Sequence, residues 1–261
     1  MDALTLLVLF LIGIVAGGLG GLLGIGGCVL MMPTVRFGFA FTPALAVGTT
    51  LTAVVFTAGA GAIKHARLGN VDKSAAATIA VSGVVGVLLG SAVFALMARY
   101  DQVVDLVVGL AFLYPAARML WEGLLQWKAP EPTQAGVGGT VTAKSLTGGL
   151  VGVLTGIIGL GGGYAMVPSM VYVLRAPMKI AVGTSLASFV WFALVGASIK
   201  LYEGFVDLPA AVAMGVGAAI GAVIGATLMA KVKTAALKAL FGAIFLYVGL
   251  KYILIAFGVQ I

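Results

Sequence analysis

Apolar residues fall into ten segments along this chain, and polar residues gather in the short stretches between them. Most of the segments are long enough to cross the hydrocarbon core of a bilayer as helices, which takes about 20 residues. The second segment of each half is shorter. The pattern predicts an all-α polytopic membrane protein with about eight to ten transmembrane segments. The segments lie at about 3–24, 27–40, 43–63, 74–98 and 103–121, and then at about 144–159, 162–174, 178–199, 208–230 and 235–257.

A long hydrophilic stretch, QWKAPEPTQAGVGGT at 126–140, separates the two sets of five segments. Its prolines, glycines and charges are typical of a connection rather than of a helix inside a bilayer. We therefore expect three parts: a first transmembrane repeat at 1–125, a polar linker at 126–140 and a second transmembrane repeat at 141–261.

The two halves share sequence at a nearly constant offset of 135 residues. GLLGIGGCVLMMP at 21–33 returns as GIIGLGGGYAMVP at 156–168, and VGTTL at 47–51 returns as VGTSL at 182–186. The tripeptide FLY at 112–114 returns at 245–247, after a slip of two residues. A fixed offset over this length indicates a duplicated unit. Each copy is predicted to contain a short or re-entrant helix that follows a glycine break.

The composition is typical of a membrane protein rather than of a soluble one. The chain is 62% hydrophobic and 9% charged, whereas soluble domains are about 25% charged. A membrane protein partnered by the lipid bilayer is therefore expected. Its net charge of +7 fits cytoplasmic loops better than nucleic-acid binding. Cys28 is the only cysteine, which excludes an intrachain disulfide.

The distribution of Lys and Arg predicts the orientation of the two halves in the membrane. If each half crosses the membrane an odd number of times, most cations share the side of the linker, and the positive-inside rule makes that side cytoplasmic. An even number divides them less unequally. We therefore expect inverted-topology repeats with both termini outside, with either five crossings per half or three plus a re-entrant pair. The cations on the linker side would be Lys64, Arg67, Lys73, Lys128, Lys144, Arg175, Lys179, Lys231, Lys233 and Lys238.

The glycine breaks are the first candidate for a substrate site. Non-helical chain at membrane depth survives only inside protein or beside water, and the helix that follows each break would point its N-terminal amides into it. Two inverted repeats would bring two such ends together near the midplane, as in many secondary transporters. Alternatively, the glycines serve only tight packing. The candidate residues are Gly24, Gly26, Gly27 and Cys28, then Gly159, Gly161, Gly162, Gly163 and Tyr164, with Pro33 and Pro168 as helix-break prolines.

Hydroxyl groups near the starts of the third and eighth segments are the second candidate. Thr49, Thr50, Thr184 and Ser185 occupy matching positions and could donate hydrogen bonds to an oxyanion; alternatively, they bond their own or neighbouring helices. Lys64 and Lys200 are candidate pathway charges that would attract anions to opposite mouths, or else lysines that snorkel to an interface.

Other conspicuous residues have structural interpretations. The single histidine, His65, is expected in a cytoplasmic loop, and Cys28 is expected to be a small buried thiol. Asp72 and Asp207 are predicted to be N-caps. Two small-residue ladders are predicted to pack helices of the two halves closely. The ladders are Ser82, Gly86 and Gly90, and Gly217, Gly221 and Gly225.

The sequence offers no catalytic constellation. It has no second histidine, no His/Cys set with metal-ligand spacing and no Ser–His pair within the apolar segments. An intramembrane protease or metalloenzyme would need one. We therefore expect no enzyme activity, no metal site and no cofactor.

The motifs together resemble those of the sulfite exporter TauE/SafE family, also called the toluene sulfonate uptake permease family. The resemblance rests on GIGG-x5-P and GLGG-x5-P, on VGT[TS]L after each, and on a Val-Asp pair before a later helix, over both halves. It implies an integral transporter with about eight spans in two repeats, in the bacterial inner membrane, for sulfite, sulfonates, sulfoacetate, thiosulfate or related anions. The family's usual third glycine is replaced here by Cys28.

These observations predict a multi-pass secondary transporter, with export as the expected direction, for a small sulfur-containing anion. The anion would bind between the two glycine breaks, and a proton or another ion would be the coupling partner if transport is coupled. Two alternatives remain at this stage: a passive anion channel and a non-transporting membrane scaffold.

Overall fold

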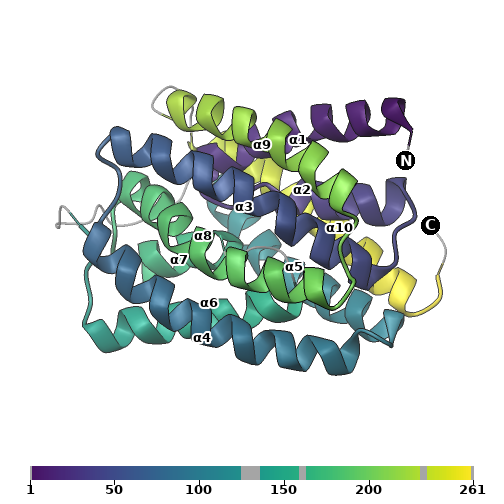
Figure 1. Ribbon diagram of the computed structural model, residues 1–261. Coiled ribbons are helices and arrows are strands. Elements are labelled where there is room, and N and C mark those ends of the chain that lie inside the picture. Colours follow the sequence, from purple (N-terminus) through teal and green to yellow (C-terminus); the bar gives the residue numbers. More distant parts are fainter. Residues whose placement is uncertain (1, 125–135, 159–162, 230–233, 260–261) are drawn as a thin grey trace.

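The computed structural model describes residues 2–124, 136–158, 163–229 and 234–259, and these residues form helices without any strand. Polar N-caps at Asp2, Thr42, Asp72 and Asp207 and glycine turns set several of the helix boundaries, and the long helices lie in one bundle (Figure 1). The helices are α1 (Ala3–Leu23), α2 (Cys28–Pro33), the π-helical turn η1 (Thr34–Gly38), α3 (Pro43–Arg67), α4 (Lys73–Met97), α5 (Asp101–Leu124), α6 (Val141–Ile158), α7 (Gly163–Tyr172), α8 (Met178–Tyr202), α9 (Leu208–Leu228) and α10 (Thr234–Ala256).

Seven of the described helices are long and apolar enough to cross a membrane: α1, α3, α4, α5, α6, α8 and α9. The described part of α10 that follows Ile244 is also apolar. In contrast, α2 has six residues and α7 has ten. The prediction of an all-α polytopic membrane protein with two short helices after glycine breaks is therefore confirmed.

Helices from before and after the linker interleave in one bundle. The most extensive contacts join α1 to α9, α4 to α6, and α5 to α10, while α3 and α8 pack on each other in the middle (Figure 1). Every one of these pairs takes one helix from each half. Each half therefore buries its apolar surface largely on the other.

The small-residue ladders lie in these contacts between the halves. A Cβ atom on Gly221 of α9 would overlap the carbonyl oxygen of Ile14 in α1, and one on Gly90 of α4 would overlap that of Val153 in α6. Close backbone approach of this kind is what small residues permit between transmembrane helices. The predicted packing role is confirmed. The other ladder residues are Ser82, Gly86, Gly217 and Gly225.

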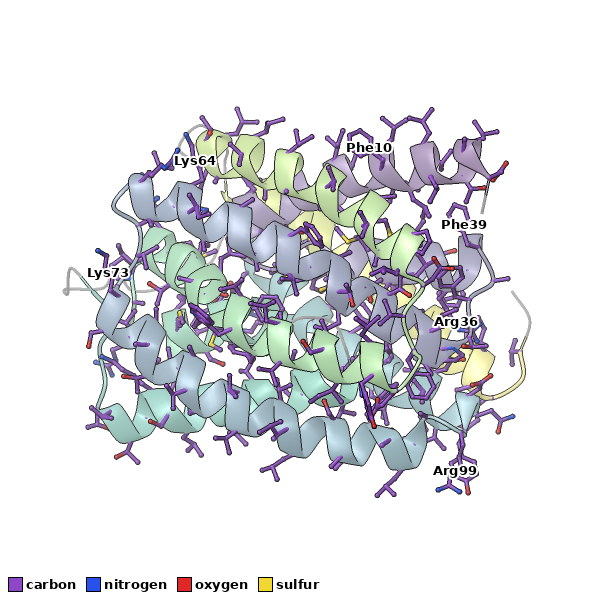
Figure 2. The ribbon with its side chains drawn as sticks, viewed as in Figure 1. Phe10, Arg36, Phe39, Lys64, Lys73 and Arg99 are labelled. Atoms are coloured by element: carbon purple, nitrogen blue, oxygen red, sulfur yellow. The ribbon has the colours of Figure 1, made fainter. Side chains whose placement is uncertain are left out.

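The bundle has two chemically different ends. Lys64 and Lys73 lie at one end, on the left in Figure 2, which we call the linker end because the Val137 amide donates to Asp72 there. Arg36 and Arg99 lie at the opposite end, on the right. The first turn of α1 and the last turn of α10 are also on the right in Figure 1, and we call this the terminus end.

Both predicted aspartate N-caps are confirmed. Asp72 accepts a hydrogen bond from the Ala75 amide at 3.0 Å, and Asp207 accepts one from the Ala210 amide at 3.0 Å. Burial raises the pKa of the Asp72 carboxylate, but hydrogen bonds from backbone amides, that of Ala75 first, lower it by more, so that its pKa lies below the ordinary value of 3.8.

The prediction that His65 lies in a loop is wrong. α3 continues to Arg67, so that His65 sits in the last turn of this helix with no exposed surface. Its Nε2 atom lies 2.8 Å from the carbonyl oxygen of Gly21 at the end of α1. The helix runs on past the apolar residues because cations in a last turn interact favourably with the helix dipole.

Candidate functional site

The first glycine break turns the chain sharply between α1 and α2. Gly24, Gly26 and Gly27 have φ angles of 74°, 74° and 79°, in the left-handed region that costs a residue with a side chain roughly 1–2 kcal/mol. The Gly24 amide donates to the Gly20 carbonyl at 2.8 Å and ends α1. Gly27 is the N-cap of α2. The glycines are therefore required by backbone geometry as well as by packing.

The first break contacts the start of α7, which belongs to the other half. A Cβ atom on Gly163 would overlap the carbonyl oxygen of Gly24 and the Cα of Ile25. Ser185 of α8 also donates to the Gly24 carbonyl at 3.1 Å. Segments 135 residues apart thus meet inside the bundle. Gly159, Gly161 and Gly162 lie outside the described residues, as does the side chain of Tyr164.

Cys28 begins the short helix α2 and has no exposed surface. Its Sγ atom lies 3.5 Å from the carbonyl oxygen of Ile25. The expectation of a small buried thiol is confirmed.

The two prolines lie inside helical segments. Pro33 is the last residue of α2, and the chain continues as the wider π-helical turn η1. Pro168 lies in the middle of α7. A proline lacks the amide that an inner turn needs, and the π-helical turn accommodates such a disturbance at Pro33.

Two of the four candidate hydroxyls join the halves. Thr49 accepts a hydrogen bond from the Asp207 amide at 2.9 Å, and Thr184 accepts one from the Asp72 amide at 3.0 Å. Each threonine therefore fixes the N-terminus of a helix from the other half, and the two bonds have matching partners. Both threonines are fully buried.

The other two hydroxyls have different partners. Thr50 donates to the Ala46 carbonyl of its own helix at 2.6 Å, whereas Ser185 donates to the first glycine break. Thr50 and Ser185 occupy matching positions in the two repeats, but among the described residues only Ser185 bonds a glycine break, the first one.

The two candidate pathway lysines differ. Lys64 is partly exposed at the linker end (Figure 2). Lys200 is fully buried: its Nζ atom lies 3.4 Å from the centroid of the Phe94 ring and 3.3 Å from Oε2 of Glu203. By the offset of 135 residues, the counterpart of Lys200 is the buried His65 rather than Lys64.

A pocket between the first break and α7 contains ionisable residues that sequence reasoning missed. The Nε of Arg118 donates to Glu122 at 2.8 Å, and the guanidinium carbon lies 4.0 Å from the centroid of the Tyr172 ring. Glu122 is buried, and 44% of the Arg118 side chain is exposed. The pocket is lined by Leu23, Ile25, Arg118, Met119, Glu122, Val167, Pro168, Val171, Tyr172 and Met178.

A second polar cluster at the terminus end was also missed. Arg36 makes two bonds to Asp105, with Nη2–Oδ2 at 2.7 Å and Nε–Oδ1 at 3.2 Å. Beside it, Tyr252 is fully buried. The sequence did contain one signal that relates the two clusters. The aromatic residues Phe37 and Tyr172 match by the 135-residue offset, and the cations Arg118 and Lys251 match by the offset of the FLY tripeptides, which is two residues shorter.

Comparison with known proteins decides the family. A family model described as "Sulfite exporter TauE/SafE" matches residues 9–252. The chain belongs to this family. TauE/SafE proteins are membrane transporters and not enzymes, and the fold of this TauE/SafE protein agrees with that class.

Curated relatives carry the same general description. The "Probable membrane transporter protein YunE" of Bacillus subtilis (strain 168) is 26% identical over 273 residues, covering 96% of this chain and 98% of that protein. A "Probable membrane transporter protein" of Xylella fastidiosa (strain 9a5c) is 32% identical over 203 residues, covering 76% of this chain and 74% of that protein. No solved structure gives a significant match to this TauE/SafE chain.

Proposed function

We propose that this TauE/SafE protein is a secondary transporter that exports a small sulfur-containing anion, such as sulfite, a sulfonate, sulfoacetate or thiosulfate. The observation that supports this most is the contact between Gly163 and the segment Gly24–Ile25. Broken helices that meet inside an apolar bundle are typical of substrate sites in secondary transporters. The proposed site is therefore the meeting point of the two breaks.

In this proposal the repeats, 1–125 and 141–261, have inverted topology. Two features support it. In Figure 1, α3 runs from right to left and α8 from left to right, although each is the second long helix of its half. The bonds of Thr49 to Asp207 and of Thr184 to Asp72 exchange matching partners between the halves, as a pseudo-twofold axis in the membrane plane would require.

The proposed site would hold an anion through backbone amides rather than a fixed lysine. The four candidate hydroxyls stay part of the proposal: Ser185, which donates to the Gly24 carbonyl of the first break, would line the site itself. Thr49 and Thr184 bond the starts of helices at opposite ends of the bundle, so that they would line the pathway on either side of the site. Thr49 and Thr184 each accept one bond through the oxygen, so that each hydroxyl proton is still free to be donated. The break glycines Gly159, Gly161 and Gly162 would complete the site.

The proposed orientation in the membrane follows from charge. Lys64 and Lys73 lie at the linker end (Figure 2), and the positive-inside rule places such an end in the cytoplasm. The protein would then reside in the inner, or plasma, membrane and release its substrate at the terminus end. We propose a proton or another ion as the coupling partner.

A counterflow assay in proteoliposomes tests the proposal. Vesicles loaded with unlabelled sulfite, ethanesulfonate or thiosulfate should accumulate the labelled anion, and the initial rate should saturate with concentration. Sulfate and acetate are the controls and should exchange much more slowly. A non-saturating conductance would indicate a channel instead, and no flux of any organosulfur anion by folded protein would refute the proposed function.

A further inference from the structure

Two pairs of a cation and an aromatic ring lie at matching positions in the two halves. The guanidinium of Arg118 in α5 lies 4.0 Å from the ring centroid of Tyr172 in α7. The Nζ of Lys251 in α10 lies 4.7 Å from the ring centroid of Phe37 in η1. Tyr172 follows Phe37 by the main offset of the repeat, and Lys251 follows Arg118 by the offset of the FLY tripeptides. The pairs therefore correspond.

The packing of α5 on α10 supports this correspondence. A Cβ atom on Gly109 of α5 would lie 2.7 Å from Cγ1 of Ile253, and one on Gly242 of α10 would lie 2.7 Å from Cγ of Leu120. By the offset of the FLY tripeptides, Gly242 matches Gly109 and Ile253 matches Leu120, so that the two contacts are equivalent under exchange of the halves. Since α10 packs mainly on α5, the two helices form a symmetric packed pair with one helix from each half.

The pair at the linker end borders an open pocket. Arg118 lies at its exposed edge, and Met119 and Glu122 line it from the same helix. The lining also contains Ile25, from the first glycine break, and Pro168, from α7. The pocket thus connects a partly exposed guanidinium with the proposed transport site.

The matching place at the terminus end is closed. Tyr252, the counterpart of Met119, has no exposed surface and packs against Phe37, with ring centroids 4.7 Å apart. The bidentate ion pair of Arg36 and Asp105 ties η1 to α5 there. Among the described residues, no group bonds the Tyr252 hydroxyl. A buried polar group without a partner is destabilising, so opening of this end to water or an anion would give the Tyr252 hydroxyl a partner.

We propose that these two places are the mouths of one anion pathway, in which Arg118 takes the substrate at the linker end and Lys251 takes it at the terminus end. The structure is the state with the linker end open and the terminus end closed. This inference rests on the proposed function and adds the residues and the class of substrate. A guanidinium pairs well with an oxyanion head, and the apolar lining favours an anion that carries an organic group over inorganic sulfite.

Among the described residues that line the pocket, Glu122 is the one carboxylate, and it pairs with Arg118. It accepts a hydrogen bond at the Nε edge of the guanidinium, and the partly exposed guanidinium faces the pocket. Because Glu122 competes with an anion for Arg118, its removal should strengthen binding. A role of Arg118 in stability alone would not produce that gain.

Binding of benzenesulfonate to the purified protein in a neutral detergent, measured by calorimetry, tests the linker-end mouth. Arg118→Gln should weaken binding at least about tenfold, and Glu122→Gln should strengthen it severalfold. The matched control is Arg99→Gln, because Arg99 also stacks on a neighbouring ring, that of Tyr100, at 5.8 Å but outside the pocket; its affinity should equal that of the wild type. Benzenesulfonate should bind more tightly than sulfite.

Flux in proteoliposomes tests the terminus-end mouth. Lys251→Gln should leave the affinity measured in detergent within about twofold of the wild type, because the linker end is open, but should lower the transport rate at least about tenfold. Unchanged flux in Lys251→Gln would overturn the pairing of the two mouths. Equal loss of binding in both variants would overturn the assignment of separate mouths.

The outcomes distinguish failure of this inference from failure of the proposed function. If the wild type transports organosulfur anions and Arg118→Gln binds and transports them equally well, the inference fails and the proposed function stands. If the wild type transports none, both fail. If phosphatidylglycerol in the micelles binds in a way that depends on Arg118 but benzenesulfonate does not bind, the pocket is a site for an anionic lipid and the inference fails.

Discussion

The hydrogen bonds that join the two halves should contribute measurably to stability. Thr49→Val and Thr184→Val keep the shape of each side chain but leave the amides of Asp207 and Asp72 without their partners, bonded at 2.9 and 3.0 Å. An unsatisfied buried amide costs about 1–3 kcal/mol, whereas side-chain bonds in membrane proteins average about 0.6 kcal/mol. Because both amides begin helices near the ends of the bundle, where water can replace part of the bond, we expect about 1 kcal/mol for each.

Thermal unfolding in detergent measures this effect. Each single variant should unfold about 2–4 °C below the wild type, and the double variant should show the sum, because the bonds lie at opposite ends and share no partner. Thr50→Val is the matched control. Its hydroxyl donates to carbonyls of its own helix, those of Ala46 and Val47, so the midpoint should change by less than about 1 °C. An equal loss in all three single variants would refute the argument.

Three further predictions concern packing, pH and accessibility. Gly17→Ala should destabilise the protein by about 1–3 kcal/mol, because its Cβ would overlap the backbone of Ala218, while Gly18→Ala, with its nearest neighbour at 3.7 Å, should be neutral or stabilising in the same unfolding assay. Asp72→Ala should unfold at a lower temperature than the wild type at pH 5–7. Because the folded pKa of Asp72 is lowered, this difference in unfolding temperature should shrink as the pH falls below about 4. A difference that grew as the pH fell would contradict the role of the Asp72 carboxylate as a cap. A water-soluble maleimide should leave the buried Cys28 unmodified until detergent denatures the protein, as mass spectrometry can show.

The helical segments and the packing role of the ladders could be predicted from the sequence because each depends on a local pattern. Long apolar runs require helices in a bilayer, and Gly221 and Gly90 lie at a spacing that exposes small residues on one face. The aspartate caps could be predicted because the cap bond spans only three residues. In contrast, the end of α3 was placed too early, since His65 is polar and its partner Gly21 is distant in sequence.

The site was predicted only in part, because its contacts cross the halves. The pattern located the glycine segments, and Gly163 at the start of α7 does contact the first break. The sequence could not distinguish Thr49, which bonds the other half, from Thr50, which bonds its own helix. Arg118 and Tyr172 were overlooked because neither lies in a repeated motif. Their relation to Lys251 and Phe37 becomes evident only when the two offsets are combined with the packing of α5 on α10.

The most direct test of the account is the flux of an organosulfur anion through variants of the glycine breaks. Gly26→Leu and Gly161→Leu, reconstituted in equal amounts of folded, membrane-inserted protein, should carry no labelled substrate. Gly26 has a φ of 74°, and its Cβ would lie 2.7 Å from Val54. Gly69→Leu is the control, since Gly69 has a similar φ of 73° with open space around it, and it should transport normally. Normal flux in the two break variants would contradict the claim that the anion crosses the membrane where the breaks meet.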